Sequence, residues 1–124
     1  MIRQDRWLFD RRWGENAGDA GFLMVPHALL INQSKLELTN AELVTLLNIL
    51  AHWFNAYDYP FPSANAIAKR MGIDRRTVER NIKSLLDKGF LTKEKNSKGA
   101  NCYNPKGIVD DLAGLYQPRS LRGR

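Results

Sequence analysis

Apolar residues recur at steps of three and four between residues 43 and 54, in the stretch LVTLLNILAHWF. This spacing keeps leucine and aromatic side chains on one side of a helix. Three further apolar residues widen that side: Val44, Ile49 and Ala51. Thr39 and Glu42 precede the stretch and are typical of a capping box at a helix start. The pattern therefore predicts a helix that is capped by Thr39, runs to about Asn55 and is buried on more than one side.

Two more helical patterns lie between Ser63 and Gly89, and Gly72 separates them. Ala68 comes four residues before that glycine and Val78 six residues after it. A small residue, a tight turn and a branched apolar residue at these offsets let two helices cross closely, which is the spacing of a helix-turn-helix. We therefore expect a DNA-binding motif here. Two side chains are placed to cap its helices: Ser63 and Asp74.

The second helix of this motif, residues 75–87, has its charges opposite its buried side. At about 100° per residue, Arg76, Arg80 and Lys83 lie opposite Val78. In helix-turn-helix docking, early residues of the second helix meet base edges in the major groove, where arginine pairs with guanine or phosphate. Glutamate in that place accepts from cytosine or orients an arginine. The alternative is a solvated face on which Glu79 and Lys83 pair at i,i+4, but the turn residues favour DNA contact.

A hairpin pattern follows Gly89. Residues 90–95 are typical of a strand, 96–100 of a polar turn, and 101–103 of an antiparallel return. Its lysines would reach backbone phosphate or the minor groove; alternatively, they protect an exposed strand edge from aggregation. The predicted DNA-binding side chains of the motif and the hairpin are Ser63, Asn65, Lys69, Arg70, Arg75, Arg76, Thr77, Glu79, Arg80, Lys83, Lys93, Lys95 and Lys98.

The N-terminal segment, residues 1–20, is basic and aromatic and ends in the loop-like stretch GENAGDAG. Its arginines either follow DNA phosphates or a groove, or are solvated while Trp7, Leu8 and Trp13 pack on the domain or on a second copy. The apolar run Phe22 to Val25 predicts a strand.

Pro26 then opens a short helical turn through residues 27–31. At the other end, Asn104 as N-cap and Pro105 as first residue predict a last helix that reaches Tyr116. That helix either packs on the core or pairs two subunits. We expect one domain at residues 21–116 and a basic tail at 117–124.

Charge and composition favour a polyanionic partner. The chain has 124 residues, with 19 Lys+Arg against 13 Asp+Glu, a net charge of +6 and a pI near 9.7. The single cysteine, Cys102, excludes an intramolecular disulfide and points to a reducing cytoplasm. No apolar run approaches the roughly 18 residues of a membrane span, and the N-terminus lacks the apolar core of a signal peptide.

Catalytic patterns are missing from the sequence. The two histidines, His27 and His52, stand outside any Ser/His/Asp or Cys/His arrangement, metal-ligand cluster or phosphate-binding glycine loop. We therefore expect no enzyme activity, no cofactor and no metal.

Residues 22–116 resemble the winged helix-turn-helix domains of bacterial, phage and plasmid regulators and replication proteins. The resemblance is carried by PSANAIAKRMGIDRRTVERNIKSLLDKGFLTKEK, with its Leu-Leu-x-x-Gly-Phe-Leu step, while GFLMVPHALL is similar to the start of such domains in plasmid and phage replication initiators. It implies a mainly α fold with a small β-hairpin wing (α+β). It also implies double-stranded DNA binding by the helix at 75–87 and the wing at 92–103.

The first functional expectation is a small sequence-specific transcriptional regulator in the bacterial cytoplasm, a homodimer on a palindromic or repeated operator. The alternative is a plasmid or phage replication initiator or partition factor, or its N-terminal DNA-binding domain, that binds origin repeats and contacts replication machinery. Initiators of this type usually carry a further domain, so the chain either departs from them or is the N-terminal part of a longer product. A second alternative is a winged helix that contacts protein or RNA.

Overall fold

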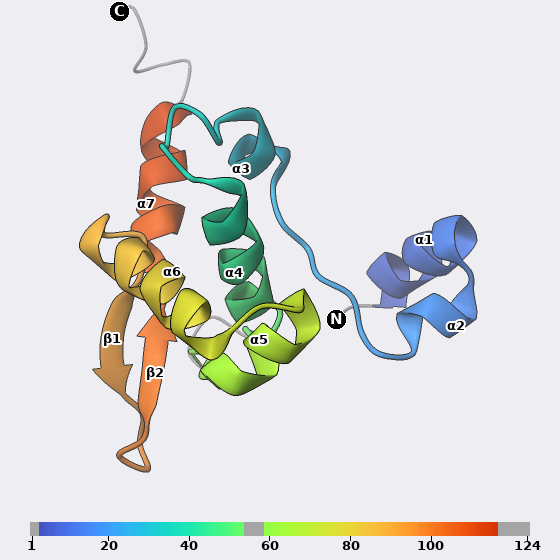
Figure 1. The fold of residues 1–124 in the computed structure, drawn as a ribbon. Coiled ribbons are helices and arrows are strands. Elements are labelled where there is room, and N and C mark those ends of the chain that lie inside the picture. The colour runs from blue at the N-terminus through green and yellow to red at the C-terminus, as the bar shows by residue number, and fades with distance from the viewer. Residues whose placement is uncertain (1–2, 54–58, 117–124) are drawn as a thin grey trace, which may run out of the picture.

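The computed structural model describes residues 3–53 and 59–116, which form helices and one two-stranded antiparallel sheet (Figure 1). The mainly helical fold with a single hairpin is thus confirmed. The elements in chain order are α1 (Arg3–Trp13), α2 (Glu15–Gly18), α3 (His27–Ile31), α4 (Asn40–Leu50), α5 (Ala64–Met71), α6 (Arg75–Asp87), β1 (Thr92–Lys95), β2 (Asn101–Asn104) and α7 (Lys106–Leu115). No helix in the described ranges is long and apolar enough to cross a membrane.

Helix α4 supplies much of the core, and α3, α5, α6 and α7 contribute side chains around it (Figure 1). Each fully buried aliphatic side chain stabilises the fold by about 1.5–3 kcal/mol relative to an exposed one. The buried apolar residues of the cluster are Leu29, Leu38, Leu43, Leu46, Ile49, Leu50, Ile67, Ala68, Val78, Ile82, Leu85, Phe90, Leu91 and Ile108.

The predicted caps of α4 and α5 are confirmed. Thr39 Oγ1 accepts from the Glu42 N–H at 3.1 Å, and Glu42 Oε1 accepts from the Thr39 N–H at 2.9 Å. Ser63 Oγ accepts from Ala66 N–H at 3.0 Å at the start of α5. At the end of α5, Gly72 has φ 66°, a left-handed conformation that favours glycine and produces the turn into α6. The helix-turn-helix is therefore built by local signals.

Helix α4 ends at Leu50, earlier than the expected Asn55, which together with Phe54 lies outside the described residues. The backbone tightens there, because His52 N–H donates to Ile49 O and Trp53 N–H donates to Leu50 O. Ile49 is buried as predicted, but the wider apolar side is wrong at two other positions. Val44 is 42% exposed and Ala51 is exposed as well.

The predicted strand at Phe22 to Val25 is wrong. Residues 21–26 form an extended connection, and the sheet of the described chain contains β1 and β2 alone. A strand requires a hydrogen-bonded neighbour, and this run has none in the sheet. The short helical turn after Pro26 is confirmed as α3, with Pro26 as its N-cap.

The N-terminal segment folds as two helices, α1 and α2, so the loop expected at 14–21 is wrong at 15–18, where α2 lies. Arg6 joins the two, with Nε 2.8 Å from Asp10 Oδ1 and a second nitrogen 3.2 Å from both Asp19 Oδ1 and the Glu15 carbonyl oxygen. Gly18 is buried against the Arg6 side chain. These two helices stand apart from the rest of the domain in Figure 1.

The aromatic residues of α1 do not pack on the domain core. Trp7 is 59% exposed and Trp13 70% exposed, so the expectation that they bury themselves on this domain is wrong. Leu8 is 50% exposed. Phe9 reaches the connection, where its ring stacks on Phe22 at 4.6 Å between centroids.

The hairpin has the predicted position and pairs Thr92 with Asn104 and Lys95 with Asn101. Its strand begins later than Phe90 because Phe90 and the next residue are buried in the core. The edge of β2 meets the connector that precedes α5, where Tyr103 N–H donates to Pro60 O at 2.8 Å.

Helix α7 packs on the core through buried Ile108, which supports the first of the two expectations for it. It begins one residue later than predicted, with Pro105 as N-cap. Asn104 Oδ1 still accepts from the Lys106 N–H at 2.9 Å, so the side chain satisfies a first-turn donor. The predicted tail at 117–124 lies outside the described residues.

Candidate nucleic-acid interface

The buried side of α6 consists of Val78, Ile82 and Leu85, and its charged residues lie on the outside. The structure exposes the basic and acidic side chains that were predicted for this face, while Thr77 is half-buried. These exposed α6 residues are Arg75, Arg76, Glu79, Arg80 and Lys83. From the first helix of the motif, Ser63, Asn65, Lys69 and Arg70 are exposed as well.

Two ion pairs divide the cations of α6 into two groups. Arg75 Nε lies 2.7 Å from Glu79 Oε1, and Lys83 Nζ lies 2.9 Å from Asp87 Oδ2. The pairing of Glu79 with Lys83, which the alternative interpretation of this face assumed, is therefore wrong. Each exposed i,i+4 pair contributes only about 0.3–0.5 kcal/mol to stability, so DNA phosphates or bases compete readily with it.

Arg76 and Arg80 form the second group, because neither has a carboxylate partner among the described residues. The guanidinium of Arg80 lies 3.4 Å from Thr77 Oγ1. They lie four residues apart, one helical turn, and project from the same face of α6. This pair is the largest uncompensated charge on the exposed face of the helix.

Arg70 is turned away from that face. Its Nη1 lies 3.4 Å from Asn48 Oδ1 and 3.2 Å from His52 Nε2, at the C-terminal end of α4. Lys69 is exposed and makes no ion pair among the described residues. Helix α5 therefore contributes Lys69 to the exposed charge, while Arg70 contacts the scaffold helix.

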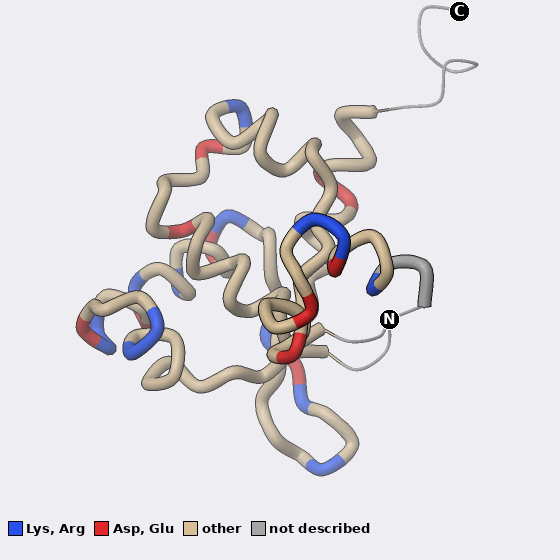
Figure 2. The backbone as a smooth tube through the Cα atoms, turned by 90° about the vertical axis from the view of Figure 1, so that its right-hand side faces the viewer, with Lys and Arg blue, Asp and Glu red and all other residues tan. Residues whose placement is uncertain are grey.

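The hairpin places its lysines in solvent. Lys93, Lys95 and Lys98 are exposed, and basic positions are seen toward the tip of the hairpin in Figure 2. Glu94, between two of them on β1, accepts from Asn104 Nδ2 at 2.6 Å and is half-buried. The hairpin lysines therefore remain available for an anionic partner.

The other strand of the hairpin, β2, carries a tyrosine that lies near α6. Burial, and then the nearby charge of Glu79, raise the pKa of Tyr103 on β2. Cys102 is buried on the same strand, and burial together with Glu94 raises the pKa of its thiol. Tyr103 of the hairpin thus lies near Glu79, on the helix that carries the exposed arginines.

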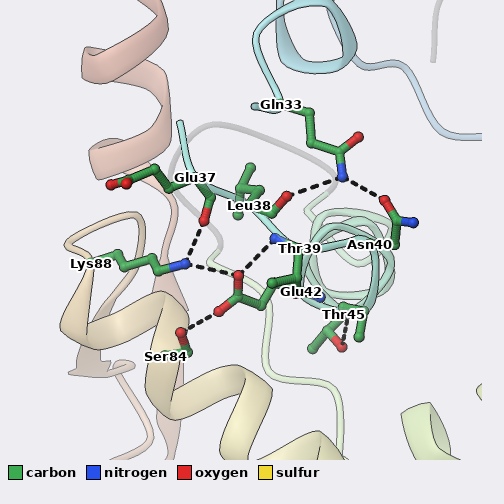
Figure 3. Close-up of polar contacts among 10 residues, drawn as sticks. Gln33, Glu37, Leu38, Thr39, Asn40, Glu42, Thr45, Ser84 and Lys88 are labelled. Carbon is green, nitrogen blue, oxygen red and sulfur yellow. Dashed lines mark hydrogen bonds and ion pairs between the residues drawn. The ribbon is translucent and has the colours of Figure 1, made fainter. Parts of the chain in front are cut away.

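A buried carboxylate under α6 was missed by sequence reasoning, which assigned Glu42 only to the cap of α4. Figure 3 shows Glu42 in contact with Ser84 and Lys88 of the α6 end, and Lys88 also donates to the Glu37 carbonyl oxygen. Burial alone would raise the pKa of Glu42, but the hydrogen bonds from Ser84 and from the Thr39 backbone, with Lys88, lower it to about 2. One sequence signal pointed to this buried role: Glu42 stands directly before the apolar stretch that begins at Leu43.

Metal chemistry has no visible site in the described ranges, since no group of three or more His, Cys, Asp or Glu side chains is placed to hold an ion. His27 is exposed and His52 half-buried. The described residues place a basic helix face and a basic hairpin on one domain.

Comparison with known proteins agrees with this architecture. The structure is similar to the crystal structure of the N-terminal domain of the DnaD protein from Geobacillus kaustophilus HTA426, with 21% sequence identity, a TM-score of 0.61 and coverage of 93% of this chain and 90% of that one. No curated protein matches the chain. A family model does match, over residues 25–114. The chain therefore belongs to the DnaD N-terminal domain family.

Proposed function

We propose that this domain binds double-stranded DNA as part of a replication system in the bacterial cytoplasm. Membership of the DnaD N-terminal domain family favours the replication alternative over the transcriptional regulator that was placed first from the sequence. The observation that carries DNA binding is the exposed Arg76 and Arg80 pair, which lacks carboxylate partners in the described chain. The domain acts by binding and not by catalysis.

In this proposal α6 enters the major groove. Arg76 and Arg80 lie in the first half of the helix, the part that meets base edges in helix-turn-helix docking. Arg75, held by Glu79 at 2.7 Å, approaches from the first turn with its guanidinium already oriented. Unpaired arginines gain charge-assisted hydrogen bonds to guanine or phosphate without first breaking an ion pair.

The remaining predicted side chains contact the sugar–phosphate backbone of the DNA. The hairpin lysines contact phosphates beside the groove, which fixes the position of the domain without selecting a sequence. Arg70 is assigned a lesser part because it contacts Asn48 and His52. The proposed backbone-contact residues are Ser63, Asn65, Lys69, Thr77, Lys83, Lys93, Lys95 and Lys98.

The deciding experiment is selection of bound duplexes from a random DNA pool, followed by footprinting of the selected motif on the source replicon. We expect repeated sites beside an origin, with binding that weakens steeply as salt rises because several phosphate contacts release counterions. A palindromic motif would indicate that the domain binds as a homodimer. Proteins of the replication machinery that co-purify with the domain would identify its partners.

Two results would contradict this proposal in different ways. A single site over a promoter would favour the interpretation of the protein as a transcriptional regulator. Failure of every duplex to bind better than a charge-matched polyanion would instead favour a winged helix that contacts protein or RNA.

A further inference from the structure

Two side-chain hydrogen bonds join α4 to α6, in addition to the ion pair between Glu42 and Lys88 at the C-terminal end of α6. Ser84 Oγ donates to Glu42 Oε2, and Asn81 Nδ2 donates to Thr45 Oγ1 at 3.1 Å. We call these two contacts the α4–α6 rungs. On each helix the two rung residues are three positions apart, with the order reversed between the helices, so both rungs fit only one antiparallel register.

The scaffold ends of both rungs are deeply buried. Thr45 is 0% exposed and Glu42 5% exposed, among the leucines that α4 presents to the core. Thr45 Oγ1 also donates to the Ala41 carbonyl oxygen at 2.8 Å, which fixes its rotamer. Lys88 holds the second carboxylate oxygen of Glu42 at 2.9 Å. Each polar atom therefore has a partner in the observed register.

Apolar ridges alone tolerate several relative positions of two helices. The contact of Val78, Ile82 and Leu85 with α4 is of this kind, because aliphatic side chains repack at small cost when total volume is kept. The rungs restrict α6 to one of these positions. A rotation or a slide of α6 would leave Glu42 Oε2 buried without its hydrogen bond from Ser84, a state that is strongly disfavoured for a buried polar group. Thr45 Oγ1 would keep its bond to the Ala41 carbonyl oxygen but lose the one it accepts from Asn81.

The rungs are also adjacent to the DNA-facing surface. Asn81 follows Arg80 in the chain, and Ser84 follows Lys83. Because successive residues differ by about 100° around a helix, fixing the direction of Asn81 and Ser84 fixes the directions of Arg80 and Lys83.

We propose that Glu42 and Thr45 are positioning residues for DNA recognition: by holding Ser84 and Asn81, they set the rotation and the register at which α6 presents its arginines. This inference rests on the proposed DNA binding. It assigns part of the discrimination between DNA sequences to two side chains that are buried in the scaffold and touch no DNA. Base readout tolerates displacements of only a fraction of an ångström, since hydrogen bonds weaken steeply with distance and angle.

The test compares a variant that lacks both hydroxyl partners with two matched controls. Thr45→Val together with Ser84→Ala removes one hydroxyl from each rung without altering any charge. Thr45→Ser keeps the hydroxyl and serves as the conservative rescue. Ile108→Val removes a methyl group from the core at α7, away from the α4–α6 contact, and controls for lost stability.

Two measurements are made on each protein. Residual dipolar couplings give the orientation of α6 relative to α4, and binding titrations give the affinity ratio between the selected duplex and a random one. For the double variant we expect a changed α6 orientation and a ratio reduced by about tenfold or more, as for removal of a good base contact. Thr45→Ser and Ile108→Val are expected to keep the orientation and the ratio of the parent.

The inference is overturned if the folded double variant keeps the parental α6 orientation, or if its affinity ratio falls no further than that of Ile108→Val at equal stability. Should the double variant fail to fold, Thr45→Val alone, which leaves Glu42 and its cap intact, provides the same comparison. If the parent protein prefers no duplex, the proposed function fails, and the orientation measurement still decides whether the rungs set the position of α6.

Discussion

Gly89 and Gly107 pack backbone against backbone, so closely that a β-carbon on Gly107 would lie 1.8 Å from the Gly89 carbonyl oxygen. The next N–H, from Ile108, donates to Phe90 O at 3.0 Å. We predict that Gly107→Ala lowers the free energy of unfolding by about 2 kcal/mol or more, because the backbone of α7 must move away from its partner. Urea titration followed by circular dichroism measures the change.

Gly114 provides the matched control in the same helix, since a β-carbon there meets nothing within 4 Å. Gly114→Ala is expected to raise the free energy of unfolding by about 0.5–1 kcal/mol, the usual gain of alanine over glycine in a helix. Equal effects of the two substitutions would show that the close approach at Gly107 has no effect on stability.

The ion pairs on α6 predict an unequal contribution of its arginines to DNA affinity. Arg76→Ala or Arg80→Ala is expected to weaken binding to the selected duplex by about 1–3 kcal/mol each. Arg75→Ala should cost less, because Glu79 already neutralises that side chain at 2.7 Å. Gel-shift titrations at fixed salt measure the order. Lys35→Ala, an exposed change of equal charge outside the motif, is the control.

Removal of the hairpin lysines should act differently. Alanine at Lys93, Lys95 and Lys98 is expected to lower affinity for all duplexes alike and to reduce the slope of log affinity against log salt by roughly 0.9 for each phosphate that is no longer neutralised. The selected motif should stay the same. A changed motif would place these lysines at base edges, and an unchanged slope would remove them from the interface.

The buried carboxylate predicts a specific acid response. The pKa of Glu42 is about 2 in the folded chain against an ordinary 4.5, so the unfolded chain takes up the proton first as the pH falls. The stabilisation, up to about 3 kcal/mol, is complete above about pH 4.5 and is lost as the pH falls toward 2.

Glu42→Gln tests this response, because glutamine does not titrate. The difference in free energy of unfolding between parent and Glu42→Gln should shrink as the pH is lowered from 5 to about 2. Asp87→Asn, at an exposed residue paired with Lys83, serves as the control with a small difference. A constant Glu42→Gln difference over this range would contradict the depressed pKa.

Cys102 is expected to be nearly inert in the folded protein. It is buried, and burial, with Glu94, raises the pKa of its thiol, so little thiolate is present near neutral pH. A disulfide reagent should react far more slowly with the native chain than with the chain in urea. Because the sequence contains one cysteine, the signal reports this residue alone. Equal rates would place the thiol at the surface.

Local chemistry explains the parts of the fold that were predictable. Thr39 with Glu42, Ser63 and Gly72 each act within a few residues, and each performs its predicted role. The run Phe22 to Val25 fails as a strand for the complementary reason: strand formation depends on a distant partner that the run itself does not specify. The helix at 15–18 likewise depends on Arg6, which lies well before it.

The candidate site shows the same division. Helical periodicity predicted which side of α6 is exposed, because that depends on the order of residues in one helix. It did not predict which charges pair, since several i,i+4 combinations were open and the structure selects Arg75 with Glu79. The contact between Glu42 and Ser84 joins residues 42 positions apart, and no short pattern encodes it.

The hydrogen bond from Tyr103 to Pro60 brings together the two ends of the segment that contains α5, α6 and the hairpin. The chain thus leaves the scaffold and returns to it at one place. Every DNA-contact residue predicted for the motif and the hairpin lies between these two points. The exposed residues of this segment can therefore be substituted while its buried residues keep their packing on α4 and the path of α3, α4 and α7 is unchanged.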